Sequence, residues 1–256
     1  MSRQLEPYQQ IERSIQKTYH KRLWTPFITA VKQYDLIAPG DRIAACISGG
    51  KDSMLMAKLL QLLQRHSDVP FEVVYLVMDP GYNAVNRQKI EYNAALLHIP
   101  VTIFSTDIFE ITSTAGQSPC YLCARMRRGY LYSKARELGC NKIALGHHFD
   151  DAVETFLMSL LYEGRIGCFE PVTYLSRTGI TQIRPMLYVG EQAIAHFAER
   201  YELPVVHNVC PADKHTKRQE VKELIVTLQA QYPDLKSKVF GAMQRLPLPK
   251  WGAEEK

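Results

Sequence analysis

The most constraining feature of this sequence is a repeated order of short apolar run, polar turn and amphipathic run. Apolar runs of strand length lie at residues 42–47, 71–79, 101–105, 142–146 and 181–184. Helical patterns follow them at residues 54–66, 86–97, 122–138, 152–162 and 191–201. Strands that alternate with helices predict a doubly wound, mostly parallel sheet, that is, a Rossmann-like α/β fold.

The two ends of the chain differ from this pattern. Between residues 6 and 34, apolar residues at spacings of four and eight predict an amphipathic helix that Pro26 kinks or splits. Another helix is expected over residues 216–229, and residues 105–119 are predicted to form a long functional loop without secondary structure. We expect a helical N-terminal extension at 1–38, a central domain at 39–212, and a C-terminal helical segment and tail at 213–256.

Composition narrows the class of protein. The 256 residues are 46% hydrophobic, which is ample for a packed core, and the formal charge of +5 favours an anionic partner. No apolar run approaches the roughly 18 residues of a membrane helix, and the polar N-terminus is unlike a signal peptide. Six cysteines are too few for a disulfide scaffold. We therefore expect a cytoplasmic protein with no membrane partner.

A glycine-containing turn joins the first predicted strand to its helix, with the sequence Ser48-Gly49-Gly50-Lys51-Asp52-Ser53. Two glycines let successive backbone N–H groups point inward at an anion, and the helix adds its positive N-terminal dipole. Hydroxyl donors, a lysine charge and a carboxylate suited to a helix cap or to Mg²⁺ complete a phosphate cradle. A plain Gly-Gly turn with a capped helix is the structural alternative.

A second turn of the same kind follows the strand at 142–146, with the sequence Gly146-His147-His148-Phe149-Asp150-Asp151. Helix capping accounts for one of the two carboxylates. Paired aspartates beside a triphosphate can hold Mg²⁺, and a histidine in the turn can donate to phosphate.

Two further polar residues end predicted strands. Asp79 ends the second strand and would face the same crevice, although an Asp-Pro-Gly sequence also favours a simple turn. Arg184 ends a later strand, where its planar charge suits a phosphate, and an exposed structural arginine is the alternative.

The cysteine pattern does not decide which metal the protein binds. Cys120 and Cys123 form a C-x-x-C pair at a helix start, and Cys210 lies in the later segment HNVCP. Three thiolates with one open position suit a [4Fe-4S] cluster, whereas adding His207 would make a Cys₃His zinc site. The isolated Cys46, Cys140 and Cys168 are interpreted as structural or spectator residues.

The glycine turn resembles the SGGxDS loop of the ATP pyrophosphatases, and the second turn resembles their GHHxDD motif. With the segment PCYLCARMRRGYLY and a later lone cysteine, over about residues 42–212, the chain resembles the tRNA 2-thiocytidine synthetase family. The resemblance implies an adenine nucleotide alpha hydrolase fold that binds ATP and Mg²⁺ and carries a [4Fe-4S] cluster. It places the cluster on Cys120, Cys123 and Cys210, with zinc as the less favoured metal.

The resemblance also assigns the other roles. ATP would be bound by Ser48, Gly49, Gly50, Lys51, Asp52, Ser53, Asp79, Gly146, His147 and Arg184, and the catalytic residues would be Asp52, Asp150, Asp151 and Cys123. The implied reaction adenylates the 2-oxo group of an anticodon-loop cytidine and replaces the oxygen with sulfur, supplied by a donor such as a cysteine desulfurase. Whether the sulfur is carried on the cluster or as a cysteine persulfide stays open. A homodimer is the expected assembly.

Basic residues supply candidate contacts to tRNA phosphates, with a solvated helix face as the alternative. They are Arg13, Lys17, Lys21 and Arg22 near the N-terminus, and Arg125, Arg127 and Arg128 after the cysteine pair. Three other functions use parts of the same pattern. They are a tRNA 2-thiouridine synthetase, an amide-forming adenylase of the tRNA-lysidine or GMP synthetase kind, and a zinc-binding RNA module without ATP cleavage.

Overall fold

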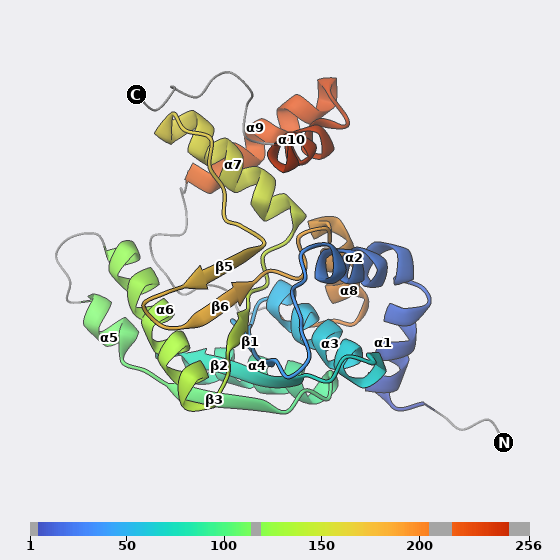
Figure 1. The fold of residues 1–256 in the computed structure, drawn as a ribbon, viewed down its shortest axis with the longest axis vertical. Coiled ribbons are helices and arrows are strands. Elements are labelled where there is room, and N and C mark those ends of the chain that lie inside the picture. Colours follow the sequence, from blue (N-terminus) through green and yellow to red (C-terminus); the bar gives the residue numbers. More distant parts are fainter. Residues whose placement is uncertain (1–4, 114–118, 205–216, 246–256) are drawn as a thin grey trace. The chain divides into compact units, whose positions relative to one another are not determined.

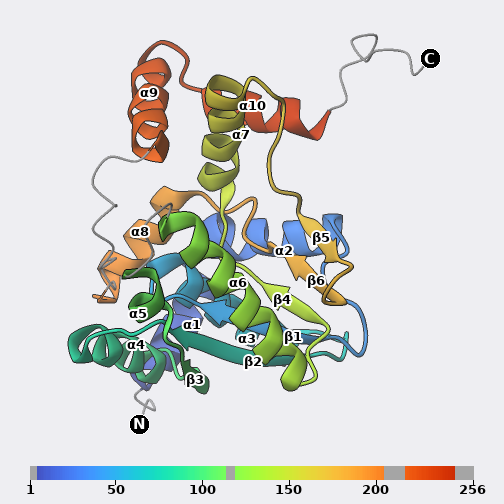
Figure 2. The same cartoon turned by 90° about the vertical axis from the view of Figure 1, so that its left-hand side faces the viewer.

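The computed structural model describes residues 5–113, 119–204 and 217–245, and Figures 1 and 2 show it in two views. The chain forms two compact units. The first comprises Met1–His148 and Glu170–Cys210, and the second comprises Phe149–Phe169 and Pro211–Lys256. Within the described ranges, no helix is both long and apolar enough to cross a membrane.

A six-stranded sheet in the first unit has the order β3-β2-β1-β4-β6-β5. Its strands are β1 (Arg42–Ile47), β2 (Glu72–Asp79), β3 (Val101–Ser105), β4 (Lys142–Ala144), β5 (Val172–Leu175) and β6 (Ile180–Ile183). Every neighbouring pair is parallel except β5 and β6, which are antiparallel. The predicted doubly wound, mostly parallel sheet is confirmed. The sequence pattern did not predict β5, because this partly exposed edge strand of four residues contains no apolar run.

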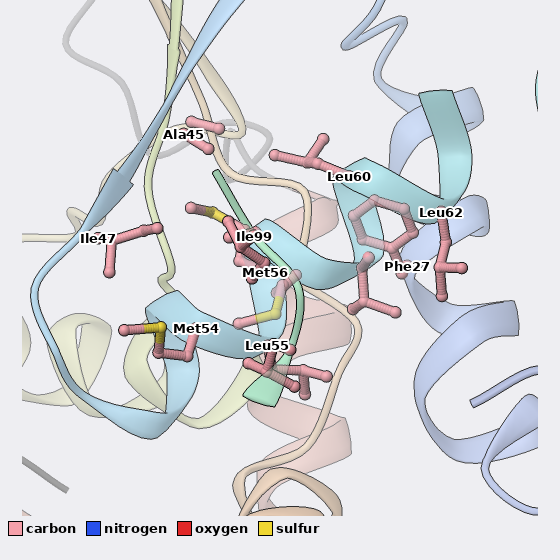
Figure 3. Packing of buried hydrophobic residues seen from close by; sticks show 14 of the residues in the cluster. Phe27, Ala45, Ile47, Met54, Leu55, Met56, Leu60, Leu62 and Ile99 are labelled. Carbon is pink, nitrogen blue, oxygen red and sulfur yellow. The ribbon is translucent and has the colours of Figure 1, made fainter. Parts of the chain in front are cut away.

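Helices cover both faces of the sheet, as the alternation of side chains along β1 requires. Ile43, Ala45 and Ile47 pack in one buried cluster with α3 (Lys51–His66), α4 (Ala84–Leu96) and α8 (Glu191–Arg200). Ala44 and Cys46 pack in the opposite cluster with α6 (Pro119–Glu137). Figure 3 shows Ala45 and Ile47 beside the methionine and leucine side chains of α3. A fully buried side chain of this kind contributes about 1.5–3 kcal/mol.

The N-terminal segment is divided into α1 (Pro7–Gln16), a π-helical turn η1 (His20–Trp24) and α2 (Thr25–Gln33). The predicted split at Pro26 is confirmed, because η1 ends at Trp24 and α2 begins at Thr25, with Pro26 in its first turn, where the missing N–H costs nothing. A second interruption, which was not predicted, lies at residues 17–19. There the N–H of Tyr19 donates to the carbonyl of Ser14, 2.9 Å away and five residues earlier.

A buried lysine joins this segment to the helix that follows β1. The Nζ atom of Lys58 on α3 donates to Oε1 of Glu12 on α1 (2.6 Å), to Oε1 of Gln61 (2.7 Å) and to the carbonyl of Leu97 (2.7 Å). Lys58 is fully buried, and burial lowers its pKa while Glu12 opposes that effect. Its three acceptors match the three N–H donors of an ammonium group, so the buried charge is satisfied.

The predicted structureless loop at residues 105–119 contains a short helix, α5 (Ile108–Ser113). Ile108 is fully buried there, which explains why six residues that follow a strand form one and a half turns of helix. The described part of the second unit contains three helices, α7 (Phe149–Glu163), α9 (Lys217–Gln231) and α10 (Leu235–Gln244). The rings of Phe149 on α7 and Phe240 on α10 pack with their centroids 4.9 Å apart.

Candidate nucleotide site

The glycine turn lies between β1 and α3 and is closed by its own hydroxyl groups. Ser53 is buried, and its Oγ accepts from the N–H of Ser48 (3.0 Å) and donates to the carbonyl of Gly50 (3.0 Å). Gly49 has a φ of +83°, a conformation that glycine adopts without the steric cost of a side chain. The first turn of α3 follows at once, and the first N–H groups of a helix have no partner within it. This geometry leaves backbone donors and a positive helix end for an anion.

The turn after β4 lies against this helix start. A Cβ atom built on Gly146 would be 3.1 Å from the backbone N of Ser53 and 3.2 Å from its Cα. Only glycine therefore permits this approach without a backbone shift. Strands β1 and β4 are parallel neighbours, and β1 is followed along the chain by β2 on its other side. The two turns thus meet at the topological switch point of the sheet, the usual ligand position in open α/β folds.

Charged side chains link three elements at this edge of the sheet. The Nζ atom of Lys51 lies 3.2 Å from Oδ1 of Asp52 and 3.5 Å from Oε1 of Glu191, the first residue of α8. On the other side, Oδ1 of Asp52 lies 3.7 Å from Nε2 of the buried His148. His147, next to it in the same turn, is half-buried. The lysine and histidine thus flank a carboxylate at the start of α3.

Asp79 lies at the end of β2 and stabilises the turn that follows. Its Oδ1 accepts from the N–H groups of Gly81 (3.0 Å) and Tyr82 (2.7 Å), and its Oδ2 accepts from Nη1 of Arg87 (3.0 Å). Burial raises the pKa of Asp79, but the hydrogen bonds from Tyr82, Gly81 and Arg87 outweigh it, so the pKa lies below its usual range. This turn also positions Tyr82, whose hydroxyl donates to the carbonyl of Ser48 in the glycine turn, 3.2 Å away.

Arg184 follows β6 and is buried rather than exposed to a solvent-filled crevice. Its Nη1 donates to the carbonyl of Glu170 and to Oγ1 of Thr173 (3.2 Å), and its Nη2 donates to Oε1 of Gln182 (3.1 Å). These contacts connect the ends of β5 and β6. In the structure, Arg184 therefore braces the antiparallel edge of the sheet.

The two aspartates of the second motif belong to the second unit, where basic residues of the C-terminal helices pair with them. Oδ1 of the buried Asp150 lies 2.7 Å from Nζ of Lys236, and Oδ1 of Asp151 lies 3.2 Å from Nη1 of Arg218. The same guanidinium lies 3.0 Å from Oε2 of Glu154, a nearly inaccessible carboxyl whose pKa is raised by burial, with Lys222 and Arg218 opposing that rise. The acidic residues at the start of α7 are thus paired with basic residues of α9 and α10.

The cysteine pair lies within the first two turns of α6. Cys123 is half-buried and forms no disulfide, whereas the side chain of Cys120 and the whole of Cys210 and His207 lie outside the described residues. Positions three residues apart share one face of a helix. Burial raises the pKa of Cys46 to about 12 and also raises that of Cys140, so both thiols stay protonated and are poor metal ligands. In the second unit, Cys168 donates to the carbonyl of Ala152, 3.4 Å away.

Metal ligands are not preassembled among the described side chains. No group of three or more His, Cys, Asp and Glu residues there could hold a metal ion. A cluster bound by three thiolates would therefore need Cys120 and Cys210 in addition to Cys123.

The predicted RNA-binding residues fall in two regions of the first unit, the N-terminal helical segment and α6. Lys17, Lys21 and Arg22 are exposed at the end of α1 and in η1. On α6, Arg125 and Arg128 are exposed, while the guanidinium carbon of Arg127 lies 5.6 Å from the centre of the Phe109 ring.

Sequence analysis missed the partners that complete these contacts. Glu191 reaches Lys51 from a different strand-to-helix turn, and Tyr82 reaches Ser48 from the turn after β2. Their position in the sequence is the signal that could have identified these two residues, because both follow the carboxyl end of a strand. Nothing local pointed to Lys236 and Arg218, which lie 86 and 67 residues from the aspartates they contact.

Comparison with known proteins identifies the family. A PP-loop domain family matches residues 7–228. The tRNA-cytidine(32) 2-sulfurtransferase of Syntrophotalea carbinolica is 38% identical over 219 residues, which are 84% of this chain and 85% of that protein. The protein of the same name from Alkalilimnicola ehrlichii is 35% identical over 234 residues, which are 90% of this chain and 74% of that protein.

A solved structure has the same fold. The U34-tRNA thiolase NcsA from Methanococcus maripaludis, determined with its [4Fe-4S] cluster, aligns with a TM-score of 0.69 and 21% identity over 86% of this chain and 77% of that one. The fold, the glycine turn at the switch point and the relatives all agree with the predicted resemblance. The chain therefore belongs to the PP-loop domain family and, within it, to the tRNA-cytidine(32) 2-sulfurtransferases.

Proposed function

We propose that this protein uses ATP to adenylate the 2-oxo group of an anticodon-loop cytidine in tRNA, and then replaces that oxygen with sulfur to give 2-thiocytidine. The observation that carries the proposal is the close approach of Gly146 to the backbone of Ser53. It brings the two motif turns together at the switch point of the sheet, in a chain 38% identical to a tRNA-cytidine(32) 2-sulfurtransferase.

Residues at the start of α3 would bind the polyphosphate of ATP. The backbone donors after Gly50 and the helix dipole favour the negative charge of the phosphates. Lys51, which Asp52 and Glu191 hold in the structure, adds a positive charge that can pair with pyrophosphate as it leaves. Tyr82 donates to the carbonyl of Ser48 and would keep the glycine turn in its binding conformation.

Carboxylates of the two motifs would bind Mg²⁺, because oxygen ligands suit that ion. Asp52 is a candidate at the helix start, and Asp150 and Asp151 are candidates at the start of α7. The two α7 carboxylates have Lys236 and Arg218 as counter-charges in the structure. Mg²⁺ would therefore have to replace those cations, just as it would have to displace Lys51 from Asp52. Asp52 belongs to the glycine turn itself and is therefore the preferred ligand for the metal that accompanies ATP.

A [4Fe-4S] cluster would be held by Cys120, Cys123 and Cys210. Cys123 fits this role, since its thiol is half-buried and forms no disulfide, and the pair lies within the first two turns of α6. When bound, a cluster on three thiolates would supply an iron with an open coordination position.

The target base must leave its stack to reach a site at the sheet edge, and an unpaired loop base costs least to extrude. Adenylation converts the cytosine oxygen, a poor leaving group, into an AMP ester that a sulfur nucleophile can displace. The proposal includes a cysteine desulfurase as the sulfur source, a cytoplasmic location and a homodimer as the working assembly.

Nucleoside mass spectrometry of bulk tRNA, from cells with and without this gene, tests the proposal. Selective loss of 2-thiocytidine, restored by the wild-type gene, is the expected result. Loss of 2-thiouridine instead would move the activity to the sibling reaction. An unchanged set of thionucleosides would contradict tRNA thiolation altogether.

A further inference from the structure

Two neighbouring cavities lie beside the interruption between α1 and η1, away from the nucleotide site of the first unit. The larger, of about 630 Å³, is lined by residues 16–22 and by His196 of α8. The smaller, of about 500 Å³, is lined by Leu5, Gln10, Arg13, Ser14, Lys17, Thr18, Arg200 and Tyr201. Lys17 and Thr18 line both cavities, so the two form one continuous surface, named here the η1 surface.

The η1 surface is positively charged. Five of its residues are basic, and no Asp or Glu lines either cavity. None of the five forms a salt bridge with another described residue, whereas Lys58 and Arg65 nearby both pair with Glu12. Cations without acidic partners on a shared surface favour an anionic ligand. The five residues are Arg13, Lys17, Lys21, Arg22 and Arg200.

A buried hydroxyl in the smaller cavity independently indicates a ligand. Ser14 is only 8% exposed, and its Oγ has no hydrogen-bond partner in the described part of the chain. A serine within a helix commonly donates back to a carbonyl one turn earlier. A buried hydroxyl without a hydrogen-bond partner is destabilising, and a ligand oxygen that accepted its hydrogen bond would recover that cost.

The wall of the larger cavity is held in place by packed aromatic residues. The Tyr19 hydroxyl lies 2.8 Å from Nδ1 of His196, and its ring packs edge-on against Phe197 with the centroids 5.5 Å apart. Burial raises the pKa of Tyr19, and the positive charges of Arg200 and Arg22 oppose the rise, which places both guanidinium groups within electrostatic reach of one hydroxyl. Because the side chain of Tyr19 is fixed, the charges are carried on a preorganised surface rather than on a frayed helix.

The π-helical turn η1 explains why Lys21 and Arg22 are exposed. The N–H of Thr25 donates to the carbonyl of His20, five residues back, so the turn contains an extra residue. Leu23 remains in the core while its neighbours Lys21 and Arg22 are exposed. Wide turns of this kind inside helices are frequently found at functional sites.

We propose that the η1 surface binds consecutive phosphate groups of the tRNA backbone, with Ser14 and Arg200 completing a site that the N-terminal basic residues begin. This inference rests on the proposed function for its choice of polyanion. Two adjoining cavities rich in unpaired cations suit a chain of phosphates better than a single free one. A free nucleotide already has a cradle at the start of α3.

The test compares tRNA binding by the wild type with binding by two charge-matched triple variants. The first carries Arg13→Gln, Lys17→Gln and Arg200→Gln. The control carries Lys32→Gln, Arg136→Gln and Arg177→Gln, three exposed cations that line neither cavity and form no salt bridge with a described residue. Filter binding with an unmodified tRNA transcript over a salt series gives the Kd and its salt dependence.

For the first variant, we expect the Kd to rise at least about tenfold near 0.1 M salt and the slope of log affinity against log salt to fall by about 2, since each lost phosphate contact removes about 0.7–0.9. The Kd of the control variant should stay within about twofold of the wild-type Kd, because its three lost charges attract tRNA only through the general charge of the protein. Ser14→Ala should raise the Kd severalfold with no change in slope, because it removes an uncharged hydrogen bond. Thermal melting verifies that each variant is folded.

The remaining outcomes are distinct. Equal weakening in both triple variants would mean diffuse attraction and would overturn the η1 site while leaving thiolation untouched. If the first variant bound tRNA with an unchanged Kd but bound ATP or inorganic phosphate more weakly, the cavities would be assigned to a small anion. That result would also overturn the η1 site. If the wild-type protein had no measurable affinity for tRNA, that result would instead contradict the proposed function itself.

Discussion

The Nε2 atom of His148 lies 3.7 Å from Oδ1 of Asp52, so the turn after β4 and the first turn of α3 face each other. His148 is buried, and the same carboxylate atom lies 3.2 Å from Nζ of Lys51. Two motifs separated by almost a hundred residues thus contribute to one charged cluster at the edge of the sheet.

Replacing Asp52 with alanine should weaken the use of ATP. The carboxylate orders Lys51 and is the proposed Mg²⁺ ligand, and losing one charged hydrogen-bonding group costs about 1.5–3 kcal/mol, so kcat/KM for ATP should fall about 10- to 100-fold. Steady-state kinetics checks this, with Asp68→Ala, near the other end of α3, as the control. Nucleotide affinity and turnover equal to wild type would reduce Asp52 to a helix-capping residue.

Gly146→Ala should displace the glycine turn. Its new Cβ would meet the backbone N and Cα of Ser53 at 3.1 and 3.2 Å, and backbone cannot move aside as a side chain can. We expect a loss of about 1–3 kcal/mol in the free energy of unfolding, typical of overpacking, together with a raised KM for ATP. Urea unfolding and kinetics provide the two measurements.

Gly129→Ala is the matched control for this substitution. Gly129 lies within α6 with open space around its Cβ position, so alanine should stabilise the protein by about 0.5–1 kcal/mol through helix propensity. If both glycine variants behaved alike, steric contact at Gly146 would not be the cause.

Asp79 should contribute stability that depends on pH. Its pKa in the folded protein lies below the ordinary value of 3.8, so its contribution is complete above pH 3.8 and is lost as the pH falls through the lowered pKa. Asp79→Asn should therefore lower the free energy of unfolding by about 1 kcal/mol at neutral pH, and the difference should vanish in acid. Urea unfolding at several pH values measures this. A difference that grew on acidification would contradict the assigned direction.

Cys123→Ala should abolish 2-thiocytidine formation while the protein still folds and binds ATP. The reason is the loss of one of three proposed cluster ligands, so iron bound by anaerobically prepared protein should also fall to background. Cys168→Ala is the control, since that thiol donates to the carbonyl of Ala152 on α7, 3.4 Å away, and belongs to the second unit. Undiminished iron and thiolation in Cys123→Ala would exclude the cluster assignment.

The nucleotide site was largely predictable because its parts follow strand ends. Residues 48–53 and 146–148 each come after an apolar run and before a helix, and parallel strands place such turns at one edge of the sheet. The roles of Asp79, Arg184, Asp150 and Asp151 stay predictions, and the structure shows what a local pattern could not contain. Asp79 stabilises its own turn, Arg184 braces β5 and β6, and the two α7 aspartates pair with Lys236 and Arg218.

By itself, the sequence determined the alternation of strands and helices, the doubly wound sheet and the two motif turns, because periodicity, glycine and chain order are local properties. Only the tertiary structure decided that the N-terminal helix is also interrupted at residues 17–19, that β5 forms an edge of the sheet, and that Ser14 of α1 and Arg200 of α8 line one cavity. Those features depend on contacts between residues far apart in the chain, and the energy of such contacts is set by burial and geometry that no short segment encodes.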